Sequence, residues 1–263
     1  MTGGDTPSAD VLAEVADGVA TVTLNRPGSR NALSSGLLSA LRATLRELDG
    51  SPEVAAIVLT GADPAFCAGL DLKELAQDGN ALSAEANPGR PLPELSKPLI
   101  GAVNGVAITG GLEIALACDF LIASERARFA DTHARIGIMP GWGLTVLLPE
   151  AVGLRRAREM SATGNFIDAP TALTWGLVNR VVPHEDLLPA ARRIGADIAS
   201  NDRDAVRVIY STYREGSLVS GEEAWQAERR AHAGWRDGSG TIDPAEVARR
   251  RENVQQRGRS QAT

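Results

Sequence analysis

Two glycine-rich segments of this sequence have backbone N–H groups that could take part in catalysis. Residues 65–73 (AFCAGLDLK) and residues 104–113 (NGVAITGGLE) each follow an apolar run and lead into a helical pattern. The first backbone N–H groups of a helix have no intrahelical partner and lie at the positive end of the helix dipole. Two such groups that converge on one point form an oxyanion hole, which stabilises a negatively charged carbonyl oxygen. Spacing alone favours the simpler alternative that both segments are only tight turns.

Glu113 is the titratable side chain that ends the second of these segments. It stands three residues after Gly110, in the first turn of the helix expected there. A carboxylate in that place commonly complements the helix dipole. The residues that follow, 114–117, are all apolar, which indicates a buried helix. Because a buried carboxylate is costly as structure and well suited to general base catalysis, both readings of Glu113 stay open.

Composition predicts a globular chain with a full hydrophobic core. The chain has 263 residues, of which 43% are hydrophobic and 23% charged. Its net charge of −6 argues against a general nucleic-acid binder. Cys67 and Cys118 lie far apart, which excludes a disulfide scaffold and fits a reducing cytoplasm. We expect neither a signal peptide in residues 1–10 nor a membrane-spanning segment.

Several common catalytic motifs are missing from the sequence. Gly111 stands where a phosphate-binding loop requires a lysine, so a nucleoside triphosphate site is not expected. No GxGxxG follows the first strand, which argues against a nicotinamide dehydrogenase. No GxSxG turn is present, which argues against the usual serine hydrolase. Metal ligands at useful spacing are also missing.

The elements that must position these turns alternate between strand and helix, which predicts an α/β fold. Asp17-Gly18 joins two apolar runs, 12–15 and 19–24, as in a β-hairpin. Ser34 or Ser35 can cap a helix with a stripe of five leucines. Buried strands are expected at 55–60, 99–103 and 120–123, and residues 76–94 read as a long loop. Helices are expected at 144–152, 154–162, 169–175, 185–199, 203–214 and 222–236.

Several motifs in register resemble the enoyl-CoA hydratase/isomerase (crotonase) family. Besides the two glycine-rich segments, they are Asn25-Arg26-Pro27, Asn31-Ala32-Leu33, residues 137–141 (GIMPG) and residues 176–183 (GLVNRVVP). Their order and spacing agree with the family over about residues 11–199. The C-terminal third matches only in helical character.

The resemblance implies an α/β fold, a crotonase-like spiral of ββα repeats with a helical C-terminal trimerisation region. It divides the chain into an acyl-CoA-binding core, 1–195, and an oligomerisation region, 196–263. The expected assembly is a homotrimer or a dimer of trimers. In this family the backbone N–H groups at Leu70 and Gly110 would hold the thioester oxygen. Thr109 departs from the usual glycine triplet and narrows the turn.

The resemblance also assigns the acid and base groups, with one departure. The family uses a glutamate at the position of Glu113 to activate water. Its hydratases usually carry a second glutamate four residues after the phenylalanine that is Phe129 here, and this chain has His133 there. Histidine can exchange protons near neutral pH, so we expect a limb in the pH profile near its ordinary range. His133 could instead only bond a backbone carbonyl, and Asp131 and Thr132 are weaker candidates that could orient it.

The resemblance implies a coenzyme A thioester as ligand, with no separate cofactor and no metal. Its substrate loops correspond here to Ser29, Arg30, Ala32, Ala68, Asp71, Leu72 and Lys73. Arg26 is more readily explained as a structural residue, and a solvated surface side chain explains Lys73 about as well. Trp142 could either wall the acyl pocket or belong to the core. Neither nucleic acid nor membrane is an expected partner.

The sequence therefore predicts a cytoplasmic enoyl-CoA hydratase that adds water to a 2-enoyl-CoA through an enolate. A single-carboxylate isomerase or decarboxylase is the first alternative, and a non-catalytic acyl-CoA-binding protein is the second. The presence of Glu113 favours an enzyme. The loss of the second glutamate keeps the alternatives open.

Overall fold

The first two strands form the hairpin that the sequence predicts. β1 (Val11–Ala16) and β2 (Val19–Leu24) pair antiparallel with Ala16 opposite Val19. Asp17 and Gly18 form the two-residue turn, and both have positive φ, at 51° and 76°. Such a turn matches the right-handed twist of the flanking strands. The computed structural model describes residues 10–77 and 89–213, together with seven scattered positions beyond them.

The leucine stripe forms the buried face of α1 (Ser35–Gly50), as predicted. The Ser34 side chain caps the helix by accepting a hydrogen bond from the Leu37 N–H at 3.1 Å. All five leucines are buried against the six-stranded sheet described below, at positions 37, 38, 41, 45 and 48. A helix with one apolar face gains most of its stability from this packing rather than from its own propensity.

Leu41 tests how much that face contributes to stability. Its side chain is fully buried, so Leu41→Ala should lower the free energy of unfolding by about 2–5 kcal/mol. Leu12, on β1, is 45% exposed, and Leu12→Ala is the matched control with a much smaller expected loss. Urea unfolding monitored by circular dichroism measures both. Equal losses would show that the α1 face is not a principal part of the core.

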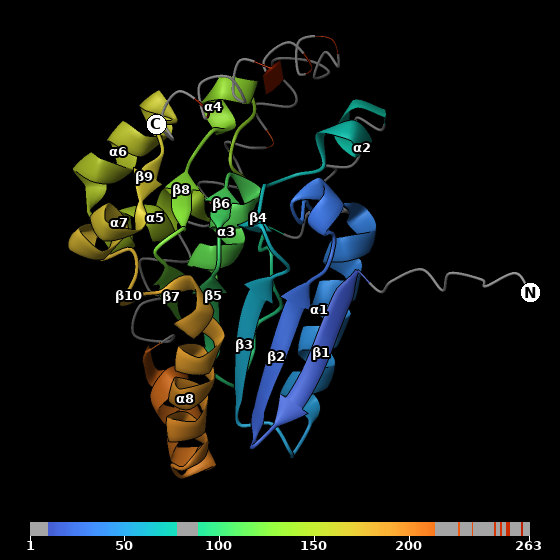
Figure 1. The fold of residues 1–263 in the computed structure, drawn as a ribbon, viewed down its shortest axis with the longest axis vertical. Helices are drawn as coiled ribbons and strands as arrows, with labels where there is room; N and C mark the ends of the chain where they lie inside the picture. The colour runs from blue at the N-terminus through green and yellow to red at the C-terminus, as the bar shows by residue number, and fades with distance from the viewer. Residues whose placement is uncertain are drawn as a thin grey trace, which may run out of the picture.

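Three consecutive ββα repeats build the centre of the molecule (Figure 1). The first is β3 (Ala56–Gly61), β4 (Ala65–Cys67) and α2 (Leu72–Gln77); the second is β5 (Leu99–Val103), β6 (Val106–Ile108) and α3 (Gly110–Leu116); the third is β7 (Phe120–Ser124), β8 (Arg128–Ala130) and α4 (His133–Ile136). The first strands of the repeats lie in a six-stranded sheet of order β1-β2-β3-β5-β7-β10. The second strands lie in a four-stranded sheet of order β4-β6-β8-β9. This confirms the predicted spiral of ββα repeats.

The rest of the described chain is mostly helical, as predicted. It contains α5 (Leu144–Val152), α6 (Leu154–Thr163), α7 (Ala169–Trp175), α8 (Leu187–Ala199) and a helical segment at 203–213, with a short 3-10 turn at His184–Asp186. Another 3-10 turn, Pro27–Ser29, lies between β2 and α1. The helix predicted at 222–236 and most of the loop predicted at 76–94 lie outside the described residues. Within those residues, no helix is long and apolar enough to cross a membrane.

Two short strands of this second half were not predicted. β9 (Ile167–Asp168) pairs antiparallel with β8, and β10 (Arg180–Val182) pairs parallel with β7. Segments of two or three residues are too short to show strand periodicity. They are strands because the neighbouring sheet edges offer unpaired backbone groups.

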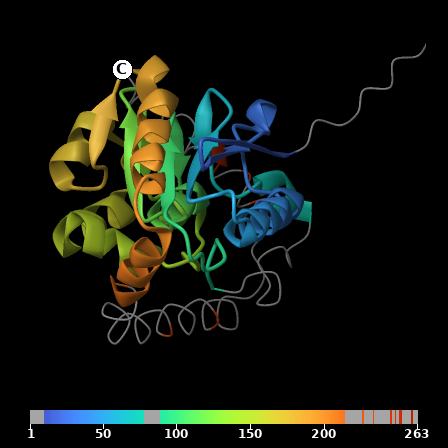
Figure 2. The same ribbon diagram turned by 90° about the horizontal axis from the view of Figure 1, so that it is seen from below.

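Helix α8 covers the face of the six-stranded sheet that α1 leaves open (Figure 2). Leu187 and Ala191 of α8 pack into a second core cluster with Val58, Ile100 and Ile122 of the sheet. The predicted division at residue 195 falls inside this helix. The assignment of residues 196–263 to oligomerisation stays a prediction.

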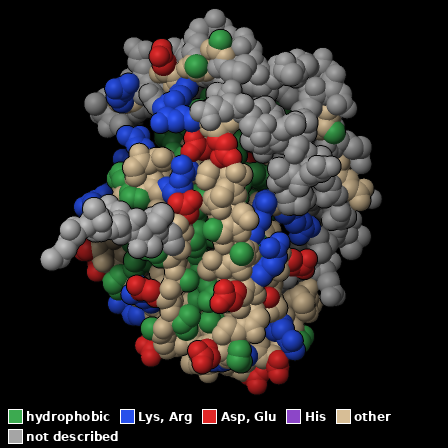
Figure 3. Space-filling model, turned by 90° about the vertical axis from the view of Figure 1, so that its right-hand side faces the viewer, with side chains coloured by type: hydrophobic (Ala, Val, Ile, Leu, Met, Phe, Trp, Pro, Cys, Tyr) green, Lys and Arg blue, Asp and Glu red, His purple; other side chains and the backbone are tan. Residues whose placement is uncertain are grey.

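The side of the molecule that carries β1 and α1 mixes apolar and charged side chains (Figure 3). On β1, Leu12 and Val15 are exposed, at 45% and 47%. β1 is the edge of the six-stranded sheet, since only β2 pairs with it among the described strands.

Candidate active site

The first glycine-rich turn is joined to Leu33 by two backbone hydrogen bonds that leave the N–H of Leu70 unused. The Leu33 N–H donates to the Gly69 carbonyl at 2.8 Å, and the Asp71 N–H donates to the Leu33 carbonyl at 3.0 Å. Because these bonds use the residues on both sides of Leu70, the N–H of Leu70 itself points away from Leu33. Gly69 has φ +88°, which an L side chain rarely adopts.

The second turn lies directly against the first. A Cβ atom added at Gly69 would lie 3.5 Å from the backbone nitrogen of Gly110, and one added at Gly110 would lie 3.7 Å from Cγ of Leu70. Gly110 is the first residue of α3, where an N–H has no partner within the helix. The structure thus brings together the two residues predicted to form an oxyanion hole.

Thr109, the departure from the glycine triplet, adopts φ 56° and ψ −115°. A non-glycine residue in this region costs about 1–3 kcal/mol and persists only where its surroundings hold it there. Its hydroxyl lies 2.6 Å from the Thr132 hydroxyl, and both side chains are buried. This contact ties the second ββα repeat to the third beside Gly110.

Glu113 points into the same region and is 2% exposed. Its Oε1 accepts a hydrogen bond from the Trp142 backbone N–H at 2.8 Å. Its Oε2 lies 3.5 Å from Nε2 of His133. That separation is longer than an ordinary N–H···O hydrogen bond, so we describe the two side chains as an ion pair.

His133 is held on its other side by Asp131. Nδ1 of His133 lies 2.7 Å from Oδ1 of Asp131, which also accepts the His133 backbone N–H at 3.1 Å. A further hydrogen bond joins Asp131 to the Ser161 side chain. This corrects the alternative in which His133 only bonds a backbone carbonyl, because its two ring nitrogens face two carboxylates.

The surroundings of His133 favour its protonated form. Burial alone would lower its pKa, but the charge of Glu113 and the hydrogen bond with Asp131 outweigh burial and raise the pKa from 6.5 to about 9. Burial likewise opposes ionisation of Asp131, yet the contact with His133 keeps the pKa of that carboxyl below its usual value. At neutral pH the ring therefore carries a proton on each nitrogen, one toward Asp131 and one toward Glu113.

The two segments predicted to bind coenzyme A, residues 29–32 and 68–73, lie side by side and form a double loop. The Ala68 N–H donates to the Arg30 carbonyl at 3.0 Å. Arg26 donates to the Ala32 carbonyl at 2.6 Å and pairs with the Asp71 carboxylate at 3.0 Å. Arg26 thus fastens one segment to the other, which agrees with the structural role expected for it.

Of the remaining predicted binding residues, Ser29, Arg30 and Lys73 are exposed, and Leu72 is half-buried. The Lys73 backbone N–H donates to the Asp71 carboxylate at 3.1 Å. This hydrogen bond lies at the start of α2.

Cys67 lies beneath the first turn and is inert. Burial raises the pKa of its thiol to about 12, so it stays protonated at neutral pH. In the described ranges 10–77 and 89–213, no three His, Cys, Asp or Glu side chains are grouped so that they could hold a metal.

A second row of hydrogen bonds joins Ser124, His184 and Asp63. Oγ of Ser124 lies 3.0 Å from Nδ1 of His184, whose Nε2 lies 3.1 Å from Asp63 Oδ2. These residue types occur together in hydrolases. Here Ser124 is fully buried and its Oγ also accepts the Arg126 N–H, so the row fastens the ends of β7 and β3 and offers no open nucleophile.

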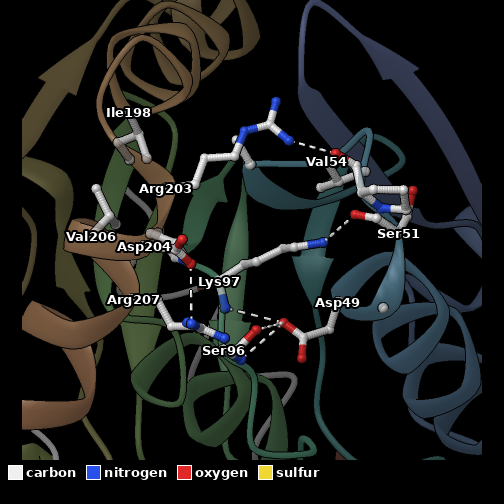
Figure 4. A pocket seen from close by; sticks show the side chains of 14 residues that line it. Asp49, Ser51, Val54, Ser96, Lys97, Ile198, Arg203, Asp204, Val206 and Arg207 are labelled. Carbon is white, nitrogen blue, oxygen red and sulfur yellow. Dashed lines mark hydrogen bonds and ion pairs between the residues drawn. The ribbon is translucent and has the colours of Figure 1, made fainter.

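A cavity of about 240 Å³ lies away from this site, at the amino-terminal ends of β3 and β5 (Figure 4). Lys97 and Arg203 cross it and donate to backbone carbonyls, of Leu48 and Ser51 and of Pro52 respectively. The cavity separates the end of α1 from the helical segment at 203–213. It contains none of the residues predicted to act on substrate.

Sequence reasoning missed two contacts of the site. One is the Trp142 backbone N–H that holds Glu113, and the other is the Ser161 side chain behind Asp131. A backbone donor has no sequence pattern of its own, and Ser161 comes from a helix, α6, that no catalytic motif marks.

The fold and the site together define a crotonase-like protein in which the turns at Leu70 and Gly110 lie together and Glu113 and His133 form a buried ion pair. The family model for enoyl-CoA hydratase/isomerase matches residues 14–237, and the chain belongs to this family. The chain is 40% identical to a probable peroxisomal enoyl-CoA hydratase of Arabidopsis thaliana, over 82% of this chain and 83% of that protein. It is 39% identical to a short-chain-enoyl-CoA hydratase of Clostridium acetobutylicum, over 84% of this chain and 87% of that protein.

Solved structures agree with these relatives. An enoyl-CoA hydratase from Mycobacterium smegmatis superposes with a TM-score of 0.81 at 48% identity, over 88% of this chain and 99% of that one. A monofunctional enoyl-CoA isomerase from the same species superposes with a TM-score of 0.67 at 34% identity, over 80% of this chain and 94% of that one. The predicted family and fold are confirmed, and the predicted hydratase-like activity agrees with the names of these relatives.

Proposed function

We propose that this protein adds water across the double bond of a 2-enoyl-CoA thioester. The observation that carries the proposal is the Glu113–His133 pair beside Gly110. It supplies two buried acid–base groups on one side of an oxyanion hole. The hydratases among its relatives support the same conclusion.

The hole stabilises the charge that the reaction creates. Addition of water at C3 pushes electrons through C2 to the thioester oxygen, which becomes an enolate oxygen. The N–H groups of Leu70 and Gly110 donate to that oxygen. Because the backbone fixes both donors in advance, little reorganisation is needed when the charge appears.

The acid–base pair moves the two protons. Glu113 takes a proton from water as its oxygen bonds to C3, and protonated His133 gives its Nε2 proton to C2. Glu113 then holds one proton and His133 lacks one. Because their atoms are 3.5 Å apart, the proton can return to His133 and reset the site. The Trp142 N–H and Asp131 hold the two side chains in place.

Protonation of His133 sets the pH dependence. The rate should stay level through neutral pH and fall as the pH rises through about 9, where His133 loses its acidic proton. This moves the limb above the range that the sequence predicts. The turnover rate of but-2-enoyl-CoA, measured from about pH 6 to about pH 10, gives the pH at which the rate falls.

Asp131→Asn provides the matched variant for that measurement. It removes the charge that helps to raise the His133 pKa, so the limb should move to lower pH. A limb that stays in place in this variant and in His133→Ala would contradict the role of His133.

The raised pKa of His133 also affects the stability of the fold. The contribution of His133 to the free energy of unfolding is full below about pH 6.5 and is lost as the pH rises through about 9.

Double-bond isomerisation is the second candidate, favoured by the structural likeness to a monofunctional isomerase. Isomerisation needs one base that carries a proton between two carbons, and Glu113 alone suffices for it. His133→Ala separates the two functions, since it should abolish hydration and spare isomerisation. Assays with 2-enoyl-CoA and 3-enoyl-CoA substrates report the two activities.

We also propose that the double loop binds the coenzyme A portion, through the residues at 29, 30, 32, 68 and 71–73. The exposed cations Arg30 and Lys73 suit its phosphates. No other cofactor and no metal enters the proposed reaction. We place the protein in the cytoplasm, where its two unpaired cysteines stay reduced.

The proposed assembly is a homotrimer or a dimer of trimers. Val208, Ile209 and Tyr213 of the helical segment at 203–213 expose large apolar side chains, at 58%, 52% and 75%. Burial of these side chains between subunits would remove them from water. Sedimentation velocity at micromolar concentration should show a trimer or hexamer. A stable monomer would contradict the assembly.

A further inference from the structure

The indole of Trp142 lies against the glycine of the hole. Its Cζ3 atom is 3.2 Å from the place a Gly110 Cβ would occupy. Leu33 Cδ1 and Leu70 Cγ lie 3.4 Å and 3.7 Å from the same place. Three apolar side chains from separate segments of the chain therefore enclose Gly110.

Both the backbone and the side chain of Trp142 are held in place. Its backbone N–H is bound to Glu113, and its side chain is only 4% exposed. The residue after it, Gly143, has φ 97° and begins the turn into α5. The ring is therefore packed in the interior beside Gly110, while the backbone of the same residue holds Glu113.

Trp142 thus spans the two places between which the reacting atoms must lie. The thioester oxygen must reach the Gly110 N–H, and C3 must come near Glu113. One residue touches both: its ring meets Gly110 and its backbone meets Glu113. The acyl chain beyond C3 has to continue past the indole.

We infer that Trp142 closes the acyl end of the site and restricts the protein to short acyl chains. Where turnover is concerned the inference rests on the proposed function, but for binding it rests on the position of the ring alone. An indole with its Cζ3 atom 3.2 Å from the position of a Gly110 Cβ leaves little space beside Gly110 for a long alkyl chain, since well-packed interiors contain few voids. Leu33 and Leu70 also lie near this position and narrow it further.

The test compares saturated acyl-CoA thioesters with butyryl, octanoyl and dodecanoyl chains. Wild-type protein should bind the butyryl thioester in preference to the longer ones. In Trp142→Ala the octanoyl-to-butyryl preference should shift by about tenfold or more toward octanoyl, since one methylene that gains or loses space in an apolar pocket changes selectivity by that order. Isothermal titration calorimetry measures the affinities, and hydration of the matching 2-enoyl thioesters gives the same profile in turnover.

Trp175→Ala is the matched control. Trp175 also packs against the core, but from α7, with Arg156 over its ring at 5.3 Å. Its loss should leave the chain-length preference unchanged. If Trp142→Ala unfolds the chain, Trp142→Phe keeps the backbone donor and a smaller ring, and should show a smaller shift in the same direction.

The outcomes separate this inference from the proposed function. Unchanged chain-length preference in folded Trp142 variants overturns the inference, even when wild-type protein hydrates enoyl-CoA. A shifted binding preference in a protein that hydrates no enoyl-CoA supports the inference and overturns the proposed function instead.

Discussion

Glu113→Gln should lower the hydration rate by about 10²–10⁴-fold and leave the affinity for a saturated acyl-CoA almost unchanged. Glutamine keeps the shape and can still accept the Trp142 N–H, but it cannot take a proton from water. Thioester binding depends on backbone donors, which the substitution leaves in place. Loss of the carboxylate charge should also lower the pKa of His133, because that charge helps to raise it.

Single-turnover hydration of but-2-enoyl-CoA and calorimetry with butyryl-CoA give the two quantities. Glu150→Gln, an exposed change on α5, is the matched control and should behave as wild type. Equal loss of affinity and of rate in Glu113→Gln would indicate that Glu113 holds the site together and takes no part in proton transfer.

Gly110→Pro should lower the hydration rate by about 10²–10³-fold, because proline has no N–H to donate to the thioester oxygen. Proline is well tolerated at the first position of a helix, but it also restricts the backbone of the preceding residue, Thr109, which has ψ −115°. Turnover and circular dichroism on the same sample separate the loss of the donor from a loss of fold.

Gly110→Ala controls for the added side chain. Alanine keeps the N–H, but its Cβ would lie 3.2 Å from Trp142 and 3.4 Å from Leu33. A small effect of alanine beside a large effect of proline would assign the loss to the donor. Equal effects of the two substitutions would attribute it to crowding and would remove Gly110 from the hole.

The parts of the fold that could be predicted are those that short stretches of sequence encode. Asp17-Gly18 specifies its hairpin because both residues tolerate positive φ. The leucine stripe of α1 follows from the helical period and the serine cap. By contrast, β9 and β10 exist only through their pairing with β8 and β7, which no local pattern shows.

The site divides in the same way. Gly110 and Glu113 stand within one motif, so their proximity could be predicted, whereas the convergence of the two glycine turns followed only from the resemblance to the family. The contact between Glu113 and the Trp142 N–H joins residues 29 positions apart, and it depends on how α5 is placed on α3. The raised pKa of His133 could not be predicted from its residue type, since it arises from the charge of Glu113 and the hydrogen bond with Asp131, which outweigh the opposing effect of burial.

The spiral gives each ββα repeat a separate share of the site. The turn after β4 carries Leu70, the turn after β6 carries Gly110, and the segment after β8 carries His133. In the proposed reaction, the groups that bind the thioester and one group that transfers a proton therefore belong to different structural units. A point substitution in the third unit can redirect the reaction while the first two continue to recognise the same ligand, which makes such a scaffold well suited to the divergence of new activities.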